Sequence, residues 1–535
     1  MQGQSGTIDD NYDVIVVGAG IGGCIMAARL AQVGVNPQNG EKLKIALFEW
    51  GPYHKGDPKR GYGIPSRRAS FDGMPYELAR RFMTPWGELG MVGGSTQWAG
   101  MIAIMPEPID FLTWQAETGV DWTMENFTYP LTETREMWHP EPEPEEVRSP
   151  GQQKFRDTAL SLGYRVTEVG QAKLNCPRCG DCNGRICRYD AKSTGLVTYA
   201  PIADHEGVHI LPQTPVEKVI IEKKGSRPVA TGVVYRKDGK PFRARADKVI
   251  LSCGWNATPV LLYQSGYGPR DKVRGELIAE NRHVGAHVRA GVAGLGVQAL
   301  FDEAVKRPDI GVHGVYTIWK ALDPRGYNTL IIREDFGSRE GTGRYPSELA
   351  ASRLAPAMGR DLKEYMAKCL THVGSMNMQV TKNRVEGEIN LQGGIVIKSR
   401  ETAGERSATD DRPGTEDEVP RSLLEKDCPE VIELLREGQA IAKKIVSQMG
   451  ARKIATDDEL PDRFGFSLPT SSCRAGASRD NSVVNSDLES HDVDNLFICD
   501  SSVLPCQGGG NLSMPTAAIC CYAWRRMVIN HFSRA

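Results

Sequence analysis

Three glycines and one acidic residue near the N-terminus have the types and spacing of a dinucleotide site. Gly18, Gly20 and Gly23 form a G-x-G-x-x-G pattern. The first glycine permits a tight turn, the second lets the backbone approach a pyrophosphate, and the third lets a helix pack closely. Glu49 ends the next apolar segment, where an acid accepts a hydrogen bond from a ribose hydroxyl. The pattern predicts a bound dinucleotide and leaves open whether it is FAD or NAD.

Two further glycine-rich segments lie far from this pattern along the chain. The first is MVGGSTQWAGM, residues 91–101, which suits a flat ring and a pyrophosphate. The second spans residues 495–524 and contains an apolar stretch, the acid Asp500, a glycine run and a helix-like stretch. A cofactor that touches three remote segments must be long, and this favours FAD.

Four cysteines within a short stretch could hold a metal. Cys176, Cys179, Cys182 and Cys187 have the spacing C-x2-C-x2-C-x4-C. Structural zinc sites usually join two cysteine pairs from separate loops, whereas a tight run resembles the thiolate arrangement of iron–sulfur proteins. The spacing favours an iron–sulfur cluster, three-iron or four-iron, with zinc and unligated thiols as alternatives. A disulfide is disfavoured by crowding.

The elements that position these residues follow from hydrophobic patterning. An all-apolar stretch, 14–17, predicts a parallel strand buried on both faces. Residues 21–33 predict a helix, and residues 44–49 predict a second strand, which completes a βαβ unit. Residues 216–253 predict three successive strands separated by turns. Pro429 starts a predicted helix that runs to residue 449.

Length and composition describe an ordinary globular protein. A chain of 535 residues with 40% hydrophobic and 25% charged residues predicts two or three domains. The net charge of −2 gives no support for a nucleic-acid partner. No apolar run approaches the ~18 residues of a membrane span, and the polar N-terminus is unlike a secretory signal. Cysteines in apolar surroundings fit a reducing, cytoplasmic location.

Together these segments resemble the glucose-methanol-choline (GMC) family of FAD oxidoreductases. The likeness is nearest to the branch of gluconate and fructose dehydrogenase flavoprotein subunits and more distant to pyranose oxidase. It implies an α/β fold with a Rossmann-like FAD-binding domain and a second, sheet-plus-helices substrate-binding domain. The predicted segments are FAD-binding 1–105, 196–295 and 456–535, a cap segment with the cysteines, 106–195, and a substrate domain, 296–455. The same branch holds an iron–sulfur cluster on a similarly spaced cysteine run.

The resemblance also assigns residues to a non-covalently bound FAD. Asn511 falls where the family places an Asn or His over the flavin, beside the substrate hydroxyl. An amide can bind or orient a group but cannot take its proton. The cofactor-binding residues implied by the resemblance are Gly18, Gly20, Gly23, Glu49, Gly93, Gly94, Ser95, Thr96, Val216, Val219, Asp500, Asn511 and Ser513.

Two positions depart from the family pattern. Gln97 stands where pyranose oxidase has the histidine that carries its flavin covalently, so a dissociable FAD is expected. Leu468 stands where the family has its proton-abstracting histidine, and leucine does no acid–base chemistry. His372 is the substitute base that we predict, and a histidine with an ordinary packing role is the alternative.

Three functions remain after this comparison of motifs. The leading one is an FAD-dependent dehydrogenase that oxidises a CH–OH group of a sugar, polyol or other alcohol, with electrons leaving through the iron–sulfur cluster to an acceptor protein or small partner subunit. Leu468 favours a second, in which a flavoenzyme performs CH–CH desaturation, isomerisation or lyase chemistry. The third is an electron-transfer subunit with a degenerate site. A small-molecule substrate is expected, with no nucleic acid.

Overall fold

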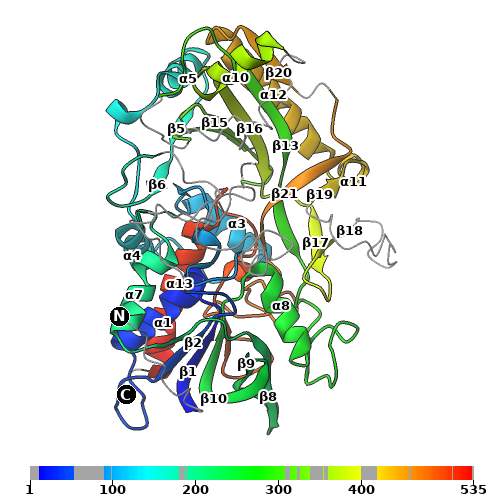
Figure 1. The fold of residues 1–535 in the computed structure, drawn as a ribbon. Helices are drawn as coiled ribbons and strands as arrows, with labels where there is room; N and C mark the ends of the chain where they lie inside the picture. The colour runs from blue at the N-terminus through cyan, green and yellow to red at the C-terminus, as the bar shows by residue number, and fades with distance from the viewer. Residues whose placement is uncertain are drawn as a thin grey trace.

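The computed structural model shows an elongated α/β molecule with two halves, each built on a β-sheet, of which the second sheet is the larger (Figure 1). No helix among the described residues is long and apolar enough to cross a membrane. The structure describes residues 11–53, 89–97, 99–179, 187, 189–307, 314–321, 324, 326–337, 354, 359–398, 418–456, 459–508 and 510–532.

The first half is organised around a seven-stranded sheet in the order β7-β2-β1-β10-β9-β8, with β22 also paired to β10. The pairs β7–β2, β2–β1, β1–β10 and β10–β22 are parallel, whereas β10–β9 and β9–β8 are antiparallel. The strands are β1 (Asn11–Val17), β2 (Ile45–Phe48), β7 (His209–Leu211), β8 (Val216–Lys224), β9 (Arg227–Lys237), β10 (Lys240–Leu251) and β22 (Leu496–Ile498). The predicted βαβ unit is confirmed, and so are the three successive strands predicted over residues 216–253.

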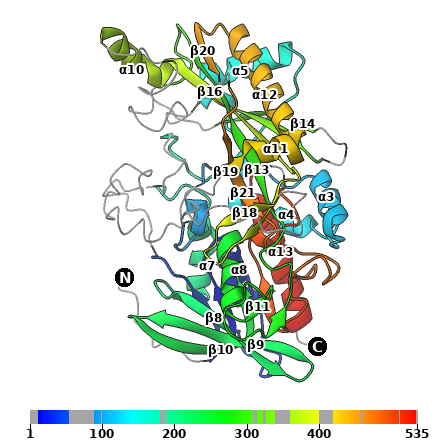
Figure 2. The same cartoon turned by 90° about the vertical axis from the view of Figure 1, so that its right-hand side faces the viewer.

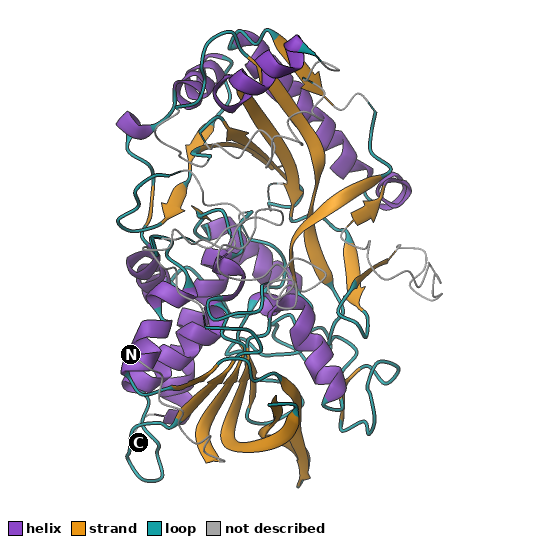
Figure 3. Cartoon of the chain, in the orientation of Figure 1, coloured by secondary structure: helices purple, strands orange, loops and turns teal. Residues whose placement is uncertain are grey.

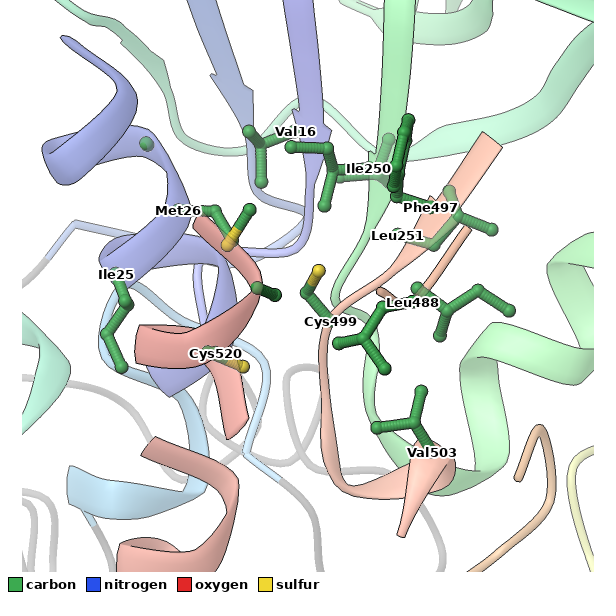
Figure 4. Close-up of a cluster of buried hydrophobic side chains, with 14 of the residues drawn as sticks. Val16, Ile25, Met26, Ile250, Leu251, Leu488, Phe497, Cys499, Val503 and Cys520 are labelled. Carbon is green, nitrogen blue, oxygen red and sulfur yellow. The ribbon is translucent and has the colours of Figure 1, made fainter. Parts of the chain in front are cut away.

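Helices cover one face of this sheet, where α1 (Ile21–Val33) packs against α13 (Ser513–Met527) and α7 (Ala200–His205) (Figure 1). The apolar faces of these helices and of the sheet form a continuous core, because parallel strands are buried on both sides. Figure 4 shows side chains that fill this core from α1, α13 and the strands; those labelled include Val16, Ile25, Met26, Ile250, Leu251, Phe497 and Cys520. The nearby short elements are α4 (Thr128–Trp138), α6 (Gly195–Thr198), α8 (Gly254–Gln264), β11 (Tyr267–Gly268), β12 (Ala279–Glu280), η4 (Ser501–Val503) and η5 (Val528–Phe532).

The second half contains a ten-stranded sheet in the order β18-β17-β13-β16-β15-β14-β5. The strands β20 and β21 also pair with β13, and β19 pairs with β21. Figure 2 shows β13 running from this sheet towards the first half of the molecule. The strands are β5 (Val166–Glu168), β13 (Val288–Leu300), β14 (Tyr316–Ala321), β15 (Thr329–Asp335), β16 (Val373–Thr381), β17 (Glu386–Ile389), β18 (Ile395–Lys398), β19 (Glu418–Pro420), β20 (Lys453–Thr456) and β21 (Arg463–Thr470).

One face of the large sheet is covered by helices, of which α12 (Pro429–Gln448) is the longest (Figure 3). This helix contacts β13, β15 and β16, and its start agrees with the prediction at Pro429. The other helices of this half are α5 (Pro150–Ser161), α10 (Arg360–His372) and α11 (Arg421–Asp427). Between the halves lie α3 (Pro108–Thr118), η1 (Gly94–Gln97) and a small sheet of β3 (Ile102–Ala103), β6 (Gly170–Ala172) and β4 (Pro140–Glu141), whereas η2 (Glu145–Val147) lies beside α5. The predicted α/β class with a second sheet-plus-helices domain is confirmed.

Candidate cofactor and active site

Two of the three motif glycines around the loop between β1 and α1, Gly18 and Gly23, occupy positions with no space for a side chain. Gly18 has φ +93° and donates its N–H to the carbonyl of Phe48 at 2.8 Å. A Cβ at Gly18 would lie 2.4 Å from the carbonyl oxygen of Ser252, and one at Gly23 would lie 1.9 Å from that of Gly18. Gly20 precedes the first turn of α1, which leaves free N–H groups and a positive dipole end for a phosphate.

A second segment, η1, lies directly against this loop. The N–H of Gly93 donates to the carbonyl of Ala19 at 2.7 Å. A Cβ at Gly94, where φ is +55°, would lie 2.9 Å from the Cα of Gly20. The two backbones therefore touch, as expected of segments that share one ligand. Gly93 and Gly94 confirm that residues far apart in the sequence are brought together here.

The rest of η1 is fixed by side-chain hydrogen bonds. Thr96 is buried, and its Oγ1 donates to the carbonyl of Gly93 at 2.5 Å and accepts from the N–H of Gly195 at 3.2 Å. Ser95 is exposed, and its Oγ accepts from the N–H of Leu89 at 3.3 Å. Gln97 is buried, and its Nε2 donates to the Oγ1 of Thr194 at 2.9 Å. Gln97 therefore helps to anchor the segment.

The buried carboxylate of Glu49 lies at the end of β2, beside the glycine loop. Its two oxygens accept from the N–H groups of Ala19 at 2.8 Å and Gly51 at 2.9 Å. Burial raises the pKa of Glu49, and these backbone donors oppose the rise. Each carboxylate oxygen has a further lone pair, so the predicted contact with a ribose hydroxyl is compatible with this geometry.

Asp500 joins three segments behind the loop. Its carboxylate accepts from the N–H of Gly254 at 3.0 Å, from the Oγ1 of Thr258 at 2.6 Å and from the N–H of Ser502 at 2.8 Å. Burial raises the pKa of Asp500, and these donors oppose the rise. Asp500 therefore caps the start of α8 and positions the C-terminal segment, a role that the sequence did not predict.

Asn511 lies where the C-terminal loop meets α13. Its Nδ2 donates to the carbonyl of Ile102 at 2.6 Å, and its Oδ1 accepts from the N–H of Ser513 at 3.3 Å and from the Ser513 Oγ at 3.4 Å. These bonds hold Asn511 and Ser513 beside β3, the strand that follows η1. The two C-terminal residues are thus brought close to the second glycine segment.

The two valines predicted at the adenine lie at different places. Val216 starts β8, just after Thr214, whose N–H donates to the carbonyl of Glu49 at 2.9 Å. Val219 is fully buried, and its N–H donates to the Oγ of Ser265 at 2.8 Å. Val216 thus lies near Glu49, the acid predicted to bind a ribose hydroxyl, whereas the structure does not bring Val219 to Glu49.

Leu468 has no described acid or histidine among its hydrogen-bonding neighbours. It has φ +54°, and its carbonyl accepts from the Nε2 of Gln507 at 2.7 Å. The same Nε2 donates to the carbonyl of Ser467 at 3.0 Å, and the Ser467 Oγ accepts from Gln379 at 2.5 Å. Sequence reasoning missed Gln507 and Gln379, because only the tertiary contacts bring these amides to the position of the family base.

His372 lies at the opposite end of the large sheet. It ends α10, and its Nδ1 contacts the Oγ1 of Thr371 at 2.8 Å and the carbonyl of Lys368 at 3.2 Å. The strand β16 separates His372 from Gln379, which at about 3.3 Å per residue is roughly 20 Å. The structure does not bring His372 together with Asn511.

The cysteine segment gives no support for an iron–sulfur cluster. Cys182 lies outside the described residues, and Cys176, Cys179 and Cys187 are free thiols. The Cys176 Sγ accepts from the N–H of Arg178 at 3.3 Å, and the Cys187 Sγ accepts from that of Ala191 at 3.4 Å. Within the described ranges, no group of three or more His, Cys, Asp or Glu side chains is arranged so that it could hold a metal ion.

The site as a whole fits a long dinucleotide. Four segments meet here at backbone distances that leave no space for side chains: the glycine loop, η1, the start of α8 and the segment after β22. For example, a Cβ at Gly22 would lie 1.9 Å from the carbonyl oxygen of Cys499. Such close backbone approach leaves N–H groups and surface for phosphates and a flat ring. Fold and site together are those of an α/β protein that can hold a long dinucleotide.

Comparison with known proteins identifies the family. Two family models described as GMC oxidoreductase match residues 12–290 and 421–520. The chain belongs to the GMC oxidoreductase family of FAD-dependent enzymes, and the predicted membership is confirmed. It is similar to a long-chain-alcohol oxidase of Arabidopsis thaliana, with 23% identity over 95% of this chain and 67% of that protein. An ecdysone oxidase of Bombyx mori is 27% identical over 49% of this chain and 42% of its own length.

Solved structures agree on the fold. Pyridoxine 4-oxidase from Mesorbium loti superposes with a TM-score of 0.61 at 18% identity and covers 97% of this chain and 99% of its own. Formate oxidase from Aspergillus oryzae superposes with a TM-score of 0.67 at 15% identity and covers 98% of this chain and 99% of its own. At these identities the likeness shows the fold alone.

Proposed function

We propose that this protein is an FAD-dependent dehydrogenase that oxidises a CH–OH group of a sugar, polyol or other alcohol. The observation that carries the proposal is the close contact of the glycine loop with η1, with Asn511 held beside β3. Several relatives are named as alcohol oxidases, which supports an alcohol as the substrate. Bound FAD would supply the hydride acceptor for such a reaction, and the hydroxyl proton would be released to water.

The residues of this chain would bind and orient rather than exchange protons. The free N–H groups at the start of α1 would hold the pyrophosphate, and Glu49 would hold a ribose hydroxyl. The amide of Asn511 is fixed by Ile102 and Ser513, so it would position a substrate oxygen and could not take its proton. His372, far from this group, is given no part in the proposed mechanism.

The predicted cluster and location stay predictions. No electron route through the cysteine segment is proposed, because the described thiols do not form a metal-binding group. The described cysteines of this segment form no disulfide, which supports a proposed reducing compartment such as the cytoplasm.

A second candidate function takes Leu468 as its supporting observation. Without a histidine at this position, the flavin would instead serve CH–CH desaturation, an isomerisation or a lyase reaction. The amides of Gln379 and Gln507 near it can bind polar groups but supply no base.

Anaerobic mixing of the flavin-loaded protein with alcohols and sugars tests the two candidates. The proposed dehydrogenase predicts loss of the oxidised flavin absorbance with at least one alcohol and release of the matching carbonyl product. Turnover of a substrate with no net flavin reduction would contradict it and favour the second candidate. An added broad absorbance with stoichiometric iron would support the cysteine prediction, and its absence after anaerobic reconstitution would refute that prediction.

A further inference from the structure

The large sheet has one apolar face and one polar face. On β15, Leu330 and Ile332 belong to the core beneath α12. Successive side chains of a strand point to opposite faces, so Ile331, Arg333 and Asp335 lie on the side of β15 away from α12. This side of the sheet is called the polar face.

The polar face lies against the C-terminal loop of the candidate site. A Cβ at Gly510 would lie 2.4 Å from the Cδ1 of Ile331 and 3.6 Å from the Cη2 of Trp319. Gly510 directly precedes Asn511. At about 3.3 Å per residue, Arg333 and Asp335 lie roughly 7 and 13 Å from Ile331 along the strand, so a ligand must extend along β15 from Asn511 to reach them.

The neighbours of Ile331 on this face are polar. Directly opposite residues in an antiparallel pair share a face, and the register places Gln379 opposite Ile331, Asn377 opposite Arg333 and Ser375 opposite Asp335. The Nε2 of Gln379 donates to Ser467, next to Leu468, which links this polar group to the position of the family base.

Two charged side chains of the polar face have buried atoms without partners. Within the described part of the chain, the Nε of Arg333 and the Oδ1 of Asp335 are buried and make no hydrogen bond. The carboxylate of Asp335 nevertheless acts electrostatically on the Arg333 guanidinium. A buried polar group without a partner destabilises the protein, so a ligand that supplied the missing partners would be held firmly.

We propose that Arg333 and Asp335 determine substrate specificity by binding adjacent hydroxyl groups of a neutral, polyhydroxylated alcohol. A guanidinium only donates and a carboxylate only accepts, whereas each hydroxyl does both. One positive and one negative charge leave this pair neutral, so no net charge is demanded of the ligand. An aliphatic chain would leave the same groups unsatisfied. The inference rests on the proposed alcohol oxidation and sharpens it to a substrate class.

The test is anaerobic stopped-flow reduction of the flavin-loaded enzyme by sorbitol, glucose, gluconate and 1-hexanol, which share a six-carbon chain. Sorbitol or glucose is expected to reduce the flavin at least 100-fold more efficiently than 1-hexanol. The variants R333Q and D335N are each expected to lower the ratio of polyol efficiency to 1-hexanol efficiency at least tenfold. Arg243, exposed on β10, gives the matched control R243Q, which should keep both rates.

The outcomes separate this inference from the proposed function. If 1-hexanol reduces the flavin more efficiently than the polyols, or gluconate exceeds both, the inference is wrong while alcohol oxidation stands. If none of the four reduces it, the proposed function fails first and the inference fails with it. Equal loss of both rates in R333Q would also contradict it. If R333Q and D335N bind no FAD, the variant N377L tests the same face, because Asn377 is exposed. N377L is expected to lose polyol efficiency selectively, and an unchanged polyol rate would overturn the inference.

Discussion

The two faces of the candidate site are built in different ways. The cofactor face is made of backbone segments in direct contact, such as Gly94 against Gly20, with little space for side chains. The sheet face is made of side chains that point away from the core, such as Arg333 and Asp335. Close backbone contact demands particular residue types, whereas a strand face tolerates many. We infer that the first face fixes the cofactor and the second sets the substrate.

The first way to test this comparison is to fill the cofactor face. In G94A the new Cβ would lie 2.9 Å from the Gly20 Cα at a φ of +55°. We expect FAD binding to weaken by at least about 100-fold, which corresponds to ~2.7 kcal/mol. The measurement is FAD affinity by fluorescence quenching.

The control for G94A separates crowding from backbone strain. Gly163 also has a positive φ, +84°, but a Cβ added there would have no atom within 4 Å. The variant G163A should bind FAD normally and lose only the roughly 1–2 kcal/mol expected for the strained backbone. Equal FAD affinities in G94A and G163A would contradict the crowded cofactor face.

A smaller effect is expected at Thr96. The variant T96V keeps the shape but leaves the Gly93 carbonyl and the Gly195 N–H without their partner. We expect the free energy of unfolding to fall by about 2 kcal/mol, with weaker FAD binding because η1 is held less firmly. Urea denaturation measures the first effect. An unchanged stability would show that Thr96 does not anchor η1.

The segment that leads from the cofactor face into β13 predicts a pH effect. His283 and His287 are hydrogen-bonded at 2.9 Å, and His287 also contacts Glu386. Burial and the neighbouring charge of His287 lower the pKa of His283 to about 4. Because this folded pKa lies below the ordinary value near 6.5, the unfolded chain binds the proton first. The stability contributed by neutral His283 is therefore present above about pH 6.5 and is lost as the pH falls towards 4.

The variant H283Q tests the direction of this pH dependence of stability. We expect wild type to lose more of its unfolding free energy than H283Q between pH 7 and pH 5, as measured by urea denaturation at both values. Parallel losses in the two proteins would mean that another group is responsible.

The smallest effect is expected at Ser95, the neighbour of Thr96. Its side chain is exposed, and its one described hydrogen bond is long, at 3.3 Å. S95A should change the unfolding free energy by less than about 0.5 kcal/mol, and its FAD affinity should stay close to that of wild type. A large loss of affinity would show that the Ser95 hydroxyl binds the cofactor directly, as the family resemblance implies.

The difference between the faces also explains what the sequence could predict. The glycine loop, α1 and β2 were predictable because glycine spacing and apolar runs depend on local backbone geometry. Asp500 was found, but its capping of Gly254 was not, because that contact joins segments far apart in the chain. The polar face could not be predicted, because Arg333 and Asp335 belong to no sequence motif. The position of His372 at the end of α10 could not be predicted from spacing alone either.

The most direct test of the account is titration of the purified protein with FAD, followed by absorbance and flavin fluorescence. The account predicts saturation at one FAD per chain, with a dissociation constant at least 100-fold lower than that of G94A and close to that of G163A. Failure of the wild-type protein to bind FAD at micromolar concentrations, while it remains folded, would contradict the claim that these segments form one flavin site.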